Sequence, residues 1–320
     1  MYKIGIIDTI NNKGIELLES NNNFSYEIIT DLSRENLLTK LPKFDGVTLR
    51  RGKLDEEILN KCKNLKVIAR HGVGYDNVDT AFLKRNNITL LVTHNSTSTS
   101  PAEHVMFMIL NIYKGREMFH TMVRDGNFHK AIHLKIDDNF EVFNKTILIA
   151  GFGRIGKKLI KKCLGFDMNV LVYDPYIDDE VISSFGGKKI LDLVEGLKEV
   201  DILSLSIPLN KETKNFITLK QMSLMKKNAI IINVSRGGVV NEADLDKALN
   251  DKTISFAGID VFEKEPPEIN NPLLKNKRVL LSPHAATFTK EGLEKMSMET
   301  IQNIIDFFED KIEEAKIVKL

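Results

Sequence analysis

The sequence predicts an α/β protein of two domains, each a doubly wound parallel sheet covered by helices. Three observations lead to this fold class. The 320 residues are enough for about two domains. Short β-branched runs alternate with helix-like runs in two separate series, and a glycine-rich motif follows the first strand of the second series. Strands that alternate with helices in this way form parallel sheets that are buried on both faces.

The first series occupies residues 1–100. We expect its strands at 3–7, 26–29, 46–49, 66–69 and 89–92. Ser33 and Asp55 stand where two of the intervening helices begin, and their side chains can accept hydrogen bonds from the N–H groups of a first helical turn. This series predicts a parallel sheet, which we expect to be flavodoxin-like.

The second series begins with an apolar, β-branched strand at 146–150. This strand leads directly into the glycine-rich motif and a lysine-rich helix. A second parallel α/β unit is therefore expected. Its further strands are expected at 169–173, 201–206, 229–234, 255–259 and 278–281.

Two helical patterns connect the series. The pattern at 101–120 is opened by Pro101 at or near the first helical position, where the missing N–H of proline has no cost. Apolar residues at helical spacing over 291–308 predict a last helix that returns the chain to the first domain. The second domain is thus expected to be inserted in the first. The expected boundaries are 1–100 plus 288–320 for the first domain and 101–287 for the second.

The composition excludes several classes of protein. Lys+Arg number 45 and Asp+Glu 44, so the formal net charge of +1 gives no basic surface for nucleic acid. The apolar runs are much shorter than the roughly 20 residues that a membrane-spanning helix needs. Cys62 and Cys163 are the only cysteines, which excludes a disulfide framework and suits a reducing cytoplasm. We expect a cytoplasmic protein with no nucleic-acid, membrane or metal partner.

The glycine motif has the spacing of a dinucleotide-binding fingerprint. Gly151, Gly153 and Gly156 open a helix, and Asp174 ends the next strand 18 residues after the third glycine (174 − 156). The first glycine permits a tight turn, the second lets the backbone approach a pyrophosphate, and the third lets the helix pack on the strand. The helix N–H groups then hold the phosphate. This context predicts a Rossmann domain, whereas the alternative is a glycine-rich turn without a ligand.

The residue type at 174 indicates which dinucleotide binds. The carboxylate of Asp174 can accept hydrogen bonds from the ribose hydroxyls of the adenosine, and it would repel the 2′-phosphate of NADP. We therefore expect NAD. Arg154 is the basic residue inside the loop, and it either assists the pyrophosphate or is a solvated surface arginine.

Chemically active side chains follow the later strands of the second domain. Arg236, Asp260 and His284 stand at strand ends, and Glu265 follows in the loop after Asp260. Ligands of open parallel sheets bind beyond the carboxyl ends of the strands, so these side chains are expected to converge near the nicotinamide. An arginine can bind a carboxylate and polarise a carbonyl oxygen, and a histidine beside a glutamate can exchange a hydroxyl proton. The set suits reversible oxidation of a 2-hydroxy acid, although each residue alone could be structural.

Longer segments carry a resemblance to a known family. They are Gly-Phe-Gly-Arg-Ile-Gly at 151–156, Val-Tyr-Asp-Pro-Tyr at 172–176, Asn-Val-Ser-Arg-Gly-Gly-Val-Val at 233–240, Asp-Val-Phe-Glu-Lys-Glu-Pro at 260–266 and Ser-Pro-His at 282–284. With these segments in this order, the chain resembles the D-isomer-specific 2-hydroxyacid dehydrogenases over essentially its whole length. The resemblance implies that Arg236, Glu265 and His284 are catalytic and that Asp260 binds the nicotinamide amide. The residues that it implies for the cofactor as a whole are Gly151, Gly153, Arg154, Ile155, Gly156, Asp174, Pro208, Val234, Ser235, Arg236, Asp260 and His284.

The resemblance also implies that the first domain binds substrate. A Gly-Val-Gly turn at 72–74 would hold the substrate carboxylate through its backbone N–H groups. Arg50 and Arg70 match arginines that hold the phosphate in 3-phosphoglycerate dehydrogenases. Membership of this branch would imply a role in serine biosynthesis. The alternative is that Arg50 and Arg51 end a strand in solvent. The substrate residues implied in this way are Arg50, Arg70, Val73, Gly74, Arg236 and His284.

Two other functions remain open at this stage. One is a hydroxypyruvate or glyoxylate reductase with the same catalytic set, and the other is an NAD-sensing binding protein similar to the transcriptional corepressors of the family. The resemblance further implies a homodimer formed through the cofactor domain, with an arm at 113–141. Ser206 departs from the histidine that the family often has at this position. We expect no C-terminal serine-sensing domain within the 320 residues.

Overall fold

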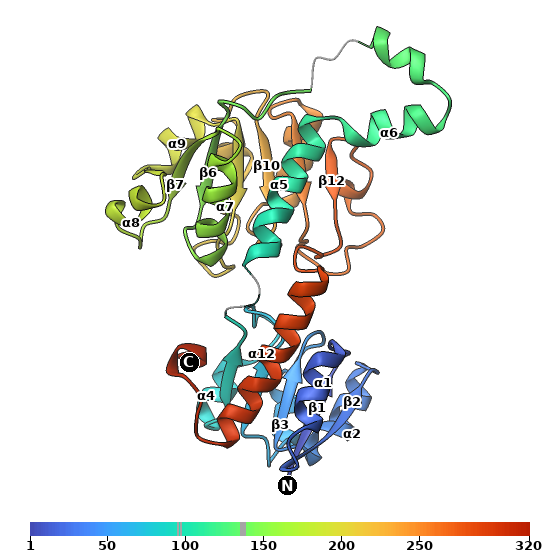
Figure 1. Cartoon of the computed structure of the whole chain (residues 1–320), viewed down its shortest axis with the longest axis vertical. Helices are drawn as coiled ribbons and strands as arrows, with labels where there is room; N and C mark the ends of the chain where they lie inside the picture. The colour runs from blue at the N-terminus through green and yellow to red at the C-terminus, as the bar shows by residue number, and fades with distance from the viewer. Residues whose placement is uncertain (95, 97, 135–138) are drawn as a thin grey trace. The chain divides into compact units, whose positions relative to one another are not determined.

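The structure, a computed structural model, describes residues 1–94, 96, 98–134 and 139–320. The chain divides into two compact units, and each unit has its own parallel sheet between layers of helices (Figure 1). The predicted fold class of two doubly wound parallel-sheet domains is confirmed. Among the described residues, no helix has the length and apolarity needed to cross a bilayer. The first unit is Met1–Thr97 with Thr287–Leu320, and the second is Ser98–Ala286.

The sheet of the first unit has the strand order β2-β1-β3-β4-β5, and every neighbouring pair is parallel. The order reverses between β1 and β3, which is where flavodoxin-like sheets bind ligands. The side chains that follow these two strands therefore occupy the favoured ligand position of this unit. The strands are β1 (Tyr2–Ile7), β2 (Phe24–Ile29), β3 (Gly46–Leu49), β4 (Val67–Arg70) and β5 (Thr89–Val92).

Helices cover both faces of this sheet. On one face α1 and α12 pack together, and Leu18 and Ile301 share a core there. The other face carries α2, α3 and α4 around Leu37 and Ile58. The bounds are α1 (Asn12–Glu19), α2 (Arg34–Lys40), α3 (Glu56–Lys61), α4 (Thr80–Arg85) and α12 (Lys290–Phe308), with single 3₁₀ turns η1 (Leu41–Lys43) and η4 (Glu314–Lys316).

The local signals in the sequence were informative in this unit. Ser33 accepts a hydrogen bond from the N–H of Asn36 and Asp55 one from the N–H of Ile58, so both predicted N-caps are confirmed. The last predicted helix starts one residue earlier than expected, at Lys290. Its N-cap is Thr289, whose side chain accepts from the N–H of Gly292.

The sheet of the second unit is parallel throughout, in the order β12-β11-β10-β9-β6-β7-β8. Its order reverses between β6 and β9, which is the nucleotide position of a Rossmann sheet. The edge strand β8 was not predicted, because two lysines carry no apolar pattern. The strands are β6 (Thr146–Ala150), β7 (Asn169–Tyr173), β8 (Lys188–Lys189), β9 (Ile202–Leu205), β10 (Ile230–Asn233), β11 (Phe256–Ile259) and β12 (Val279–Leu281).

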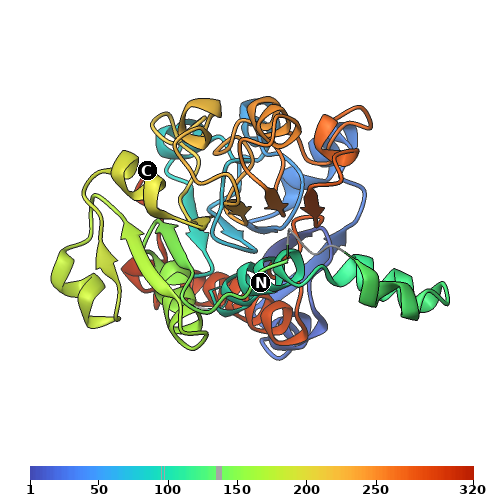
Figure 2. The same cartoon turned by 90° about the horizontal axis from the view of Figure 1, so that it is seen from above.

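Two cores flank this sheet. α5 and α7 cover one face, with Ile109 and Leu159 in their core, and α9, α10 and α11 cover the other, with Leu197 and Leu245 in theirs. α6 and η2 extend away from the sheet of this unit (Figures 1 and 2). The bounds are α5 (Thr99–Tyr113), α6 (Arg116–Arg124), η2 (Phe128–His133), α7 (Arg154–Leu164), α8 (Asp179–Ser184), α9 (Leu193–Glu199), α10 (Leu219–Met222), α11 (Glu242–Asn250) and η3 (Pro272–Leu274).

The prediction of one long helix at 101–120 was wrong. α5 ends at Tyr113, and α6 begins after Gly115, whose left-handed φ of 55° breaks the helical backbone. Pro101 is the third residue of α5, where an N–H still lacks a partner within the helix. Of the expected arm at 113–141, residues 135–138 lie outside the described residues.

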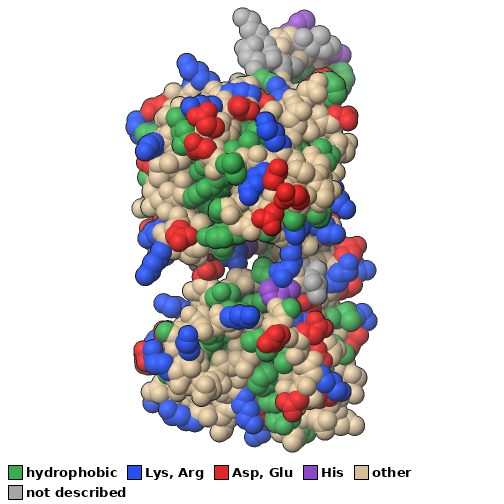
Figure 3. All heavy atoms as spheres, turned by 90° about the vertical axis from the view of Figure 1, so that its left-hand side faces the viewer, with side chains coloured by type: hydrophobic (Ala, Val, Ile, Leu, Met, Phe, Trp, Pro, Cys, Tyr) green, Lys and Arg blue, Asp and Glu red, His purple; other side chains and the backbone are tan. Residues whose placement is uncertain are grey.

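Charged side chains of both signs are interspersed on the face drawn in Figure 3. This mixture agrees with the nearly equal numbers of 45 basic and 44 acidic residues. The surface in this view therefore has no large area of one charge.

Candidate active site

The glycine-rich loop joins β6 to α7, where the strand order of the second unit reverses. Gly151 has a φ of 98°, and a Cβ there would lie 2.6 Å from the carbonyl oxygen of Ser206. A Cβ on Gly156 would lie 2.4 Å from the carbonyl oxygen of Gly151. Around Gly153, by contrast, an added Cβ would meet no atom of the described chain within 4 Å. Two of the glycines are therefore required by the chain itself, and the third leaves space beside the loop.

This space suits the pyrophosphate of a dinucleotide. It lies at the N-terminus of α7, where Gly153 supplies no side-chain cap to the first helical turn. Helix N–H groups without a cap bind phosphate well. The buried Oγ of Ser206 also has no hydrogen-bond partner among the described residues. The loop thus offers donors and room that the folded chain itself does not use.

Asp174 follows β7 and fixes a negative charge beside the loop. Its Oδ2 accepts the N–H of Phe152 at 2.8 Å, and its Oδ1 accepts the N–H of Tyr176 at 2.9 Å. Each carboxylate oxygen keeps a further lone pair, which a ribose hydroxyl could use. A 2′-phosphate would meet the same carboxylate with like charge. The arrangement fits NAD.

The turn after β10 is held by Asn233, which the sequence analysis did not single out. Its Oδ1 accepts the N–H and the hydroxyl of Ser235 at 3.0 and 2.7 Å, and its Nδ2 donates to the carbonyl oxygen of Arg236 at 3.0 Å.

The other cofactor candidates occupy the expected strand ends and the start of α7. Val234 and Ser235 are buried after β10, Pro208 is exposed after β9, Arg154 is exposed and Ile155 is half-buried in the first turn of α7.

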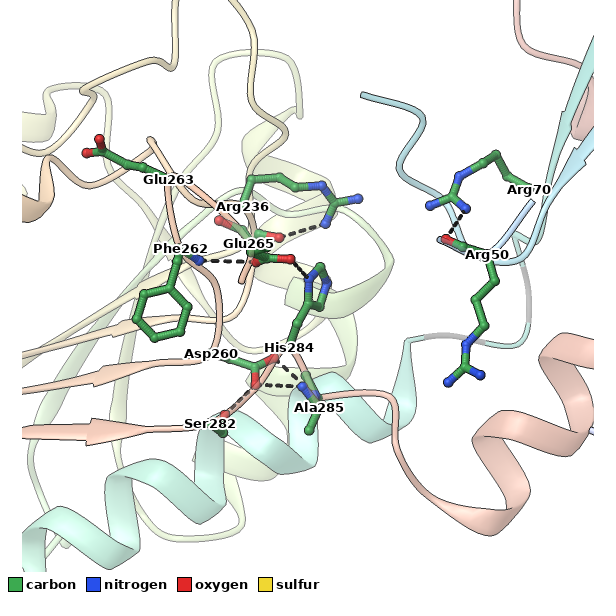
Figure 4. Close-up of polar contacts among 12 residues, drawn as sticks. Arg50, Arg70, Arg236, Asp260, Phe262, Glu263, Glu265, Ser282, His284 and Ala285 are labelled. Atoms are coloured by element: carbon green, nitrogen blue, oxygen red, sulfur yellow. Dashed lines mark hydrogen bonds and ion pairs between the residues drawn. The ribbon is translucent and has the colours of Figure 1, made fainter. Parts of the chain in front are cut away.

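The three predicted catalytic side chains lie together at the carboxyl end of the second unit's sheet (Figure 4). Arg236 follows β10, Glu265 follows β11 and His284 follows β12. His284 Nδ1 lies 2.7 Å from Glu265 Oε2, and Glu265 Oε1 accepts the N–H of Phe262 at 3.1 Å. The sequence could not show this contact because 19 residues separate the two side chains (284 − 265).

Glu265 is ionised at neutral pH. Burial alone would raise its pKa, but the hydrogen bond and charge of His284, the N–H of Phe262 and the charge of Arg236 together lower the pKa below its usual value. An ionised carboxylate only accepts hydrogen bonds, so Nδ1 of His284 carries a hydrogen and donates it. Nε2 is then the ring atom of His284 that can exchange a proton with a substrate.

Asp260 is fully buried directly after β11 and holds the backbone on either side of His284. Its Oδ1 accepts the hydroxyl of Ser282 and the N–H of Ala285, the latter at 2.8 Å, and its Oδ2 accepts the N–H of Ala286 at 3.0 Å. Its carbonyl oxygen accepts the N–H of His284 at 2.7 Å. His284 has a φ of 51°, which is uncommon for a residue with a side chain. Asp260 therefore stabilises a strained backbone, in addition to the nicotinamide contact expected of it.

The predicted substrate residues belong to the first unit. Arg70 is the last residue of β4, and its guanidinium holds the following turn. Its Nε donates to the carbonyl oxygen of Gly74, and its Nη1 donates to those of Leu49 and Arg50, the latter at 2.8 Å. Val73 and Gly74 are both half-buried. Arg70 thus connects the ends of β3 and β4 to the Gly-Val-Gly turn.

Arg50 and Arg51 follow β3, at the ligand position of the first sheet, but their surroundings differ. Arg51 pairs with Asp8, with Nε 2.5 Å from Oδ2 and Nη2 3.1 Å from Oδ1. Burial opposes ionisation of Asp8, but the hydrogen bond and charge of Arg51 and the N–H of Thr9 lower its pKa. Arg50 donates to the carbonyl oxygen of Thr9 at 2.9 Å and lies 5.6 Å from the ring centroid of Phe288. Arg51 is therefore neutralised by Asp8, whereas Arg50 forms no ion pair with a carboxylate among the described residues.

His71 precedes the Gly-Val-Gly turn and is only 5% exposed. Among the described residues, neither of its ring nitrogens has a hydrogen-bond partner. Burial, together with the positive charges of Arg50 and Arg70, lowers the pKa of His71 to about 3, against a smaller opposing effect of Asp8. The folded protein therefore carries His71 as a neutral imidazole at neutral and mildly acidic pH.

Because His71 is buried in its neutral form, we expect the stability of the folded protein to fall with pH already above the pH range in which carboxylates titrate. Below about pH 6.5 the unfolded chain binds a proton at His71 that the folded chain does not, so stability falls as the pH falls. Between pH 7.5 and pH 5 the loss from this residue is expected to be on the order of 2 kcal/mol. Urea denaturation of the parent and of His71→Phe across this range measures it.

His71→Phe is expected to lose less stability than the parent on acidification. His104, whose pKa burial also lowers despite the opposing charge of Asp260, leaves a residual slope in both proteins. The difference between the two slopes therefore isolates His71. Parallel slopes for parent and variant would show that the buried imidazole is not the cause.

Comparisons with known proteins bear on the family and the cofactor of the chain. Residues 106–286 match the family described as D-isomer specific 2-hydroxyacid dehydrogenase, NAD binding domain. The D-3-phosphoglycerate dehydrogenase of Methanocaldococcus jannaschii is 36% identical over 293 residues, which are 91% of this chain and 55% of that protein. The glyoxylate reductase of Thermococcus litoralis is 35% identical over 321 residues, which cover 97% of this chain and 95% of that protein. A crystal structure of D-lactate dehydrogenase from Aquifex aeolicus with NAD and lactic acid matches with a TM-score of 0.87 at 28% identity, covering 98% of each chain.

These matches differ in extent. The chain spans about half the length of the phosphoglycerate dehydrogenases, 55% and 57% of two of them, and nearly the full length of the glyoxylate reductase. The matched domain is named for NAD, and the Aquifex structure contains it, so the prediction of NAD as cofactor is confirmed. The predicted family is confirmed as well. The chain belongs to the D-isomer specific 2-hydroxyacid dehydrogenase family, a family of NAD-dependent oxidoreductases.

Proposed function

We propose that the protein is an NAD-dependent D-2-hydroxyacid dehydrogenase in which Arg236, Glu265 and His284 are the catalytic residues. The observation that carries this proposal is the 2.7 Å contact between His284 Nδ1 and the ionised Glu265, beside Arg236, in the NAD-binding domain. Because Nδ1 is bonded to Glu265, Nε2 is the ring nitrogen of His284 that remains to carry a proton to or from the substrate. In this proposal residues 1–100 with 288–320 supply substrate-binding groups, and residues 101–287 bind the cofactor.

The chain's own residues would work as follows. NAD held by the cofactor domain would supply the hydride chemistry at C2 of the substrate. During oxidation, neutral His284 accepts the hydroxyl proton on Nε2, and the charge of Glu265 stabilises the imidazolium that forms. During reduction, the same proton returns to the carbonyl oxygen. Arg236 binds the substrate carboxylate and polarises the carbonyl oxygen with its planar set of donors.

For the substrate, we propose 3-phosphoglycerate, with the phosphate held by Arg50 at the strand-order reversal of the first sheet. Two D-3-phosphoglycerate dehydrogenases at 36% and 32% identity support this choice. Such an activity belongs to serine biosynthesis. The second candidate is a hydroxypyruvate or glyoxylate reductase. This candidate has no phosphate to bind, and two arginines of the first unit already have partners within the chain. Nε and Nη1 of Arg70 donate to backbone carbonyl oxygens, and Arg51 pairs with Asp8.

A matched pair of substrates separates the two candidates. D-Glycerate differs from 3-phosphoglycerate only in the phosphate, so the ratio of their KM values reports phosphate binding. We expect Arg50→Gln to raise the KM for 3-phosphoglycerate about tenfold or more, because a charge-assisted hydrogen bond is lost, and to leave the KM for glycerate within about threefold. Steady-state kinetics with NAD for both substrates, and with NADH for glyoxylate and hydroxypyruvate, provide the measurement.

Arg85→Gln is the matched control. Arg85 is an exposed arginine of the same unit that pairs with Glu56 at 2.9 Å, and its replacement should leave both KM values unchanged. An unchanged KM for 3-phosphoglycerate in Arg50→Gln, with faster turnover of glyoxylate by the parent, would replace the first candidate by the second. Tight NADH binding without turnover of any substrate would instead favour the alternative of an NAD-sensing binding protein, similar to a corepressor.

We also propose a homodimer formed through the cofactor domain and a cytoplasmic location. Exposed apolar side chains on α6 and η2 support the dimer, since Met118, Val123 and Phe128 are 44%, 55% and 61% exposed on the segment that extends from the second unit. The two cysteines support the location, because both are free and buried and neither needs an oxidising compartment.

A further inference from the structure

His104 contacts the loop that carries His284, although no catalytic role has been assigned to it. It lies on α5, and its side chain is only 16% exposed. Its Nε2 is 3.0 Å from Ser282 Oγ and 3.6 Å from Asp260 Oδ1. His104, Ser282 and Asp260 therefore form one hydrogen-bonded group in the second unit, which we call the Asp260 cluster.

The direction of each hydrogen bond in the Asp260 cluster follows from the number of hydrogens available. The carboxylate of Asp260 accepts the Ser282 hydroxyl, which uses the only hydrogen of that hydroxyl. The Ser282 oxygen can then only accept from His104, so Nε2 of His104 carries a hydrogen. Burial lowers the pKa of His104 against the opposing charge of Asp260, so the ring is neutral at neutral pH and Nδ1 has no hydrogen. The sequence of donors is fixed from His104 through Ser282 to Asp260.

The Asp260 cluster surrounds the backbone of His284 on both sides. Ser282 precedes it by two residues, and Ala285 and Ala286 directly after it donate their N–H groups to Asp260. The N–H of Ser282 is itself bonded to the carbonyl oxygen of Ile259 at 3.0 Å. Between these fixed points the left-handed backbone of His284, at a φ of 51°, aims its ring at Glu265 (Figure 4). A change in the orientation of the Asp260 carboxylate would therefore move the ring.

We propose that His104 is a positioning residue for the reaction: its Nε2–H fixes the Ser282 hydroxyl on Asp260, and Asp260 in turn fixes the backbone that aims His284 at Glu265 and the substrate. The inference rests on the proposed role of His284 as the proton carrier. His104 touches neither substrate nor cofactor in this proposal. It acts through the orientation of two other side chains.

The donor on Nε2 can be removed while an aromatic ring is kept at this position. His104→Phe keeps an aromatic ring in the same place but cannot donate, whereas His104→Gln places an amide N–H near the position of Nε2. We expect His104→Phe to lower kcat about tenfold, since a small misplacement of a catalytic group is costly. The KM values for substrate and NADH should stay within about twofold. His104→Gln should restore kcat to within about twofold of the parent.

Ser282→Ala supplies an independent test. It interrupts the same hydrogen-bond chain one step closer to Asp260, so the double variant with His104→Phe should be no slower than the slower single variant. This pairing also keeps the inference testable if His104→Phe does not fold, because Ser282→Ala and His104→Gln still report on the chain. Fluorescence titration with NADH and thermal denaturation of each variant separate misfolding from misplacement.

The outcomes distinguish this inference from the proposed function. If His284→Asn retains the kcat of the parent, the proposed function fails, and the role of His104 fails with it. If His284→Asn is slow but His104→Phe is as fast as the parent, His104 has no positioning role and the proposed function stands. Equal losses in His104→Phe and His104→Gln, or a change in KM instead of kcat, would likewise overturn the inference.

Discussion

His284→Asn is expected to lower kcat by roughly 10²–10⁴-fold, because it removes the group that exchanges the hydroxyl proton. Asparagine is the informative replacement here. His284 adopts a φ of 51°, and asparagine is one of the few residues with a side chain that adopt this conformation readily. The backbone N–H of residue 284 can still donate to the carbonyl oxygen of Asp260. The variant should therefore fold and bind NADH while its chemistry is slow, which steady-state kinetics and NADH titration can measure.

Glu265 provides a matched test of the same assignment. Glu265→Gln removes the charge that stabilises the imidazolium and should also lower kcat by at least tenfold. Glu263→Gln is its control, since Glu263 lies in the same loop and accepts the N–H of Glu242 through an oxygen that glutamine keeps. It should keep the kcat of the parent. A His284→Asn protein that binds NADH and turns over as fast as the parent would disprove the catalytic assignment.

Much of the fold follows from local patterns in the sequence. The strands at 46–49, 89–92, 146–150 and 169–173 begin and end where they were predicted, because each is a short apolar run bounded by polar or turn residues. The parallel arrangement then follows from the alternation of strands with helices. The exceptions are informative: β8 has only two lysines, and the break at Gly115 lies inside an otherwise helical pattern.

The candidate site was predictable as a set of residues, but its internal contacts were not. That Arg236, Asp260, Glu265 and His284 stand at neighbouring strand ends could be read from their positions, because parallel strands bring their carboxyl ends to one edge. Which atoms meet depends on loop conformation, as in the contact between Glu265 and His284.

Backbone partners were the hardest contacts to foresee. Arg70 was expected to bind a phosphate, yet its Nε and Nη1 donate to carbonyl oxygens, and these groups leave no trace in the residue letters. The same holds for Asp260. Its carboxylate accepts the N–H groups of Ala285 and Ala286, and its carbonyl oxygen accepts the N–H of His284. Sequence patterns identify side chains that are capable of binding or catalysis. The fold decides which of their donors and acceptors are already occupied by hydrogen bonds within the protein.

Gly237→Ala is expected to destabilise the protein by about 3 kcal/mol or more, since an added methyl group would meet backbone that cannot move aside easily. A Cβ at this position would lie 1.8 Å from the carbonyl oxygen of Phe262 and 2.5 Å from the nitrogen of Glu263. Relief of this overlap must separate the turn after Arg236 from the loop that carries Glu265. Because the N–H of Phe262 donates to Glu265, activity should fall together with stability. Urea denaturation and kcat/KM of the purified variant measure the two effects.

Gly153→Ala is the matched control for this prediction. Its φ of −72° is open to alanine, and an added Cβ there would meet no described atom of the chain within 4 Å. Alanine also restricts the unfolded chain more than glycine does, so the stability of Gly153→Ala should equal that of the parent or exceed it by less than about 1 kcal/mol. The two variants make the same chemical change in the same unit, and only the space around the new methyl group differs. If both unfolded at the same urea concentration as the parent, the close approach of Gly237 to Phe262 would not exist in the folded protein, and the positions assigned to Arg236 and Glu265 would have to be revised.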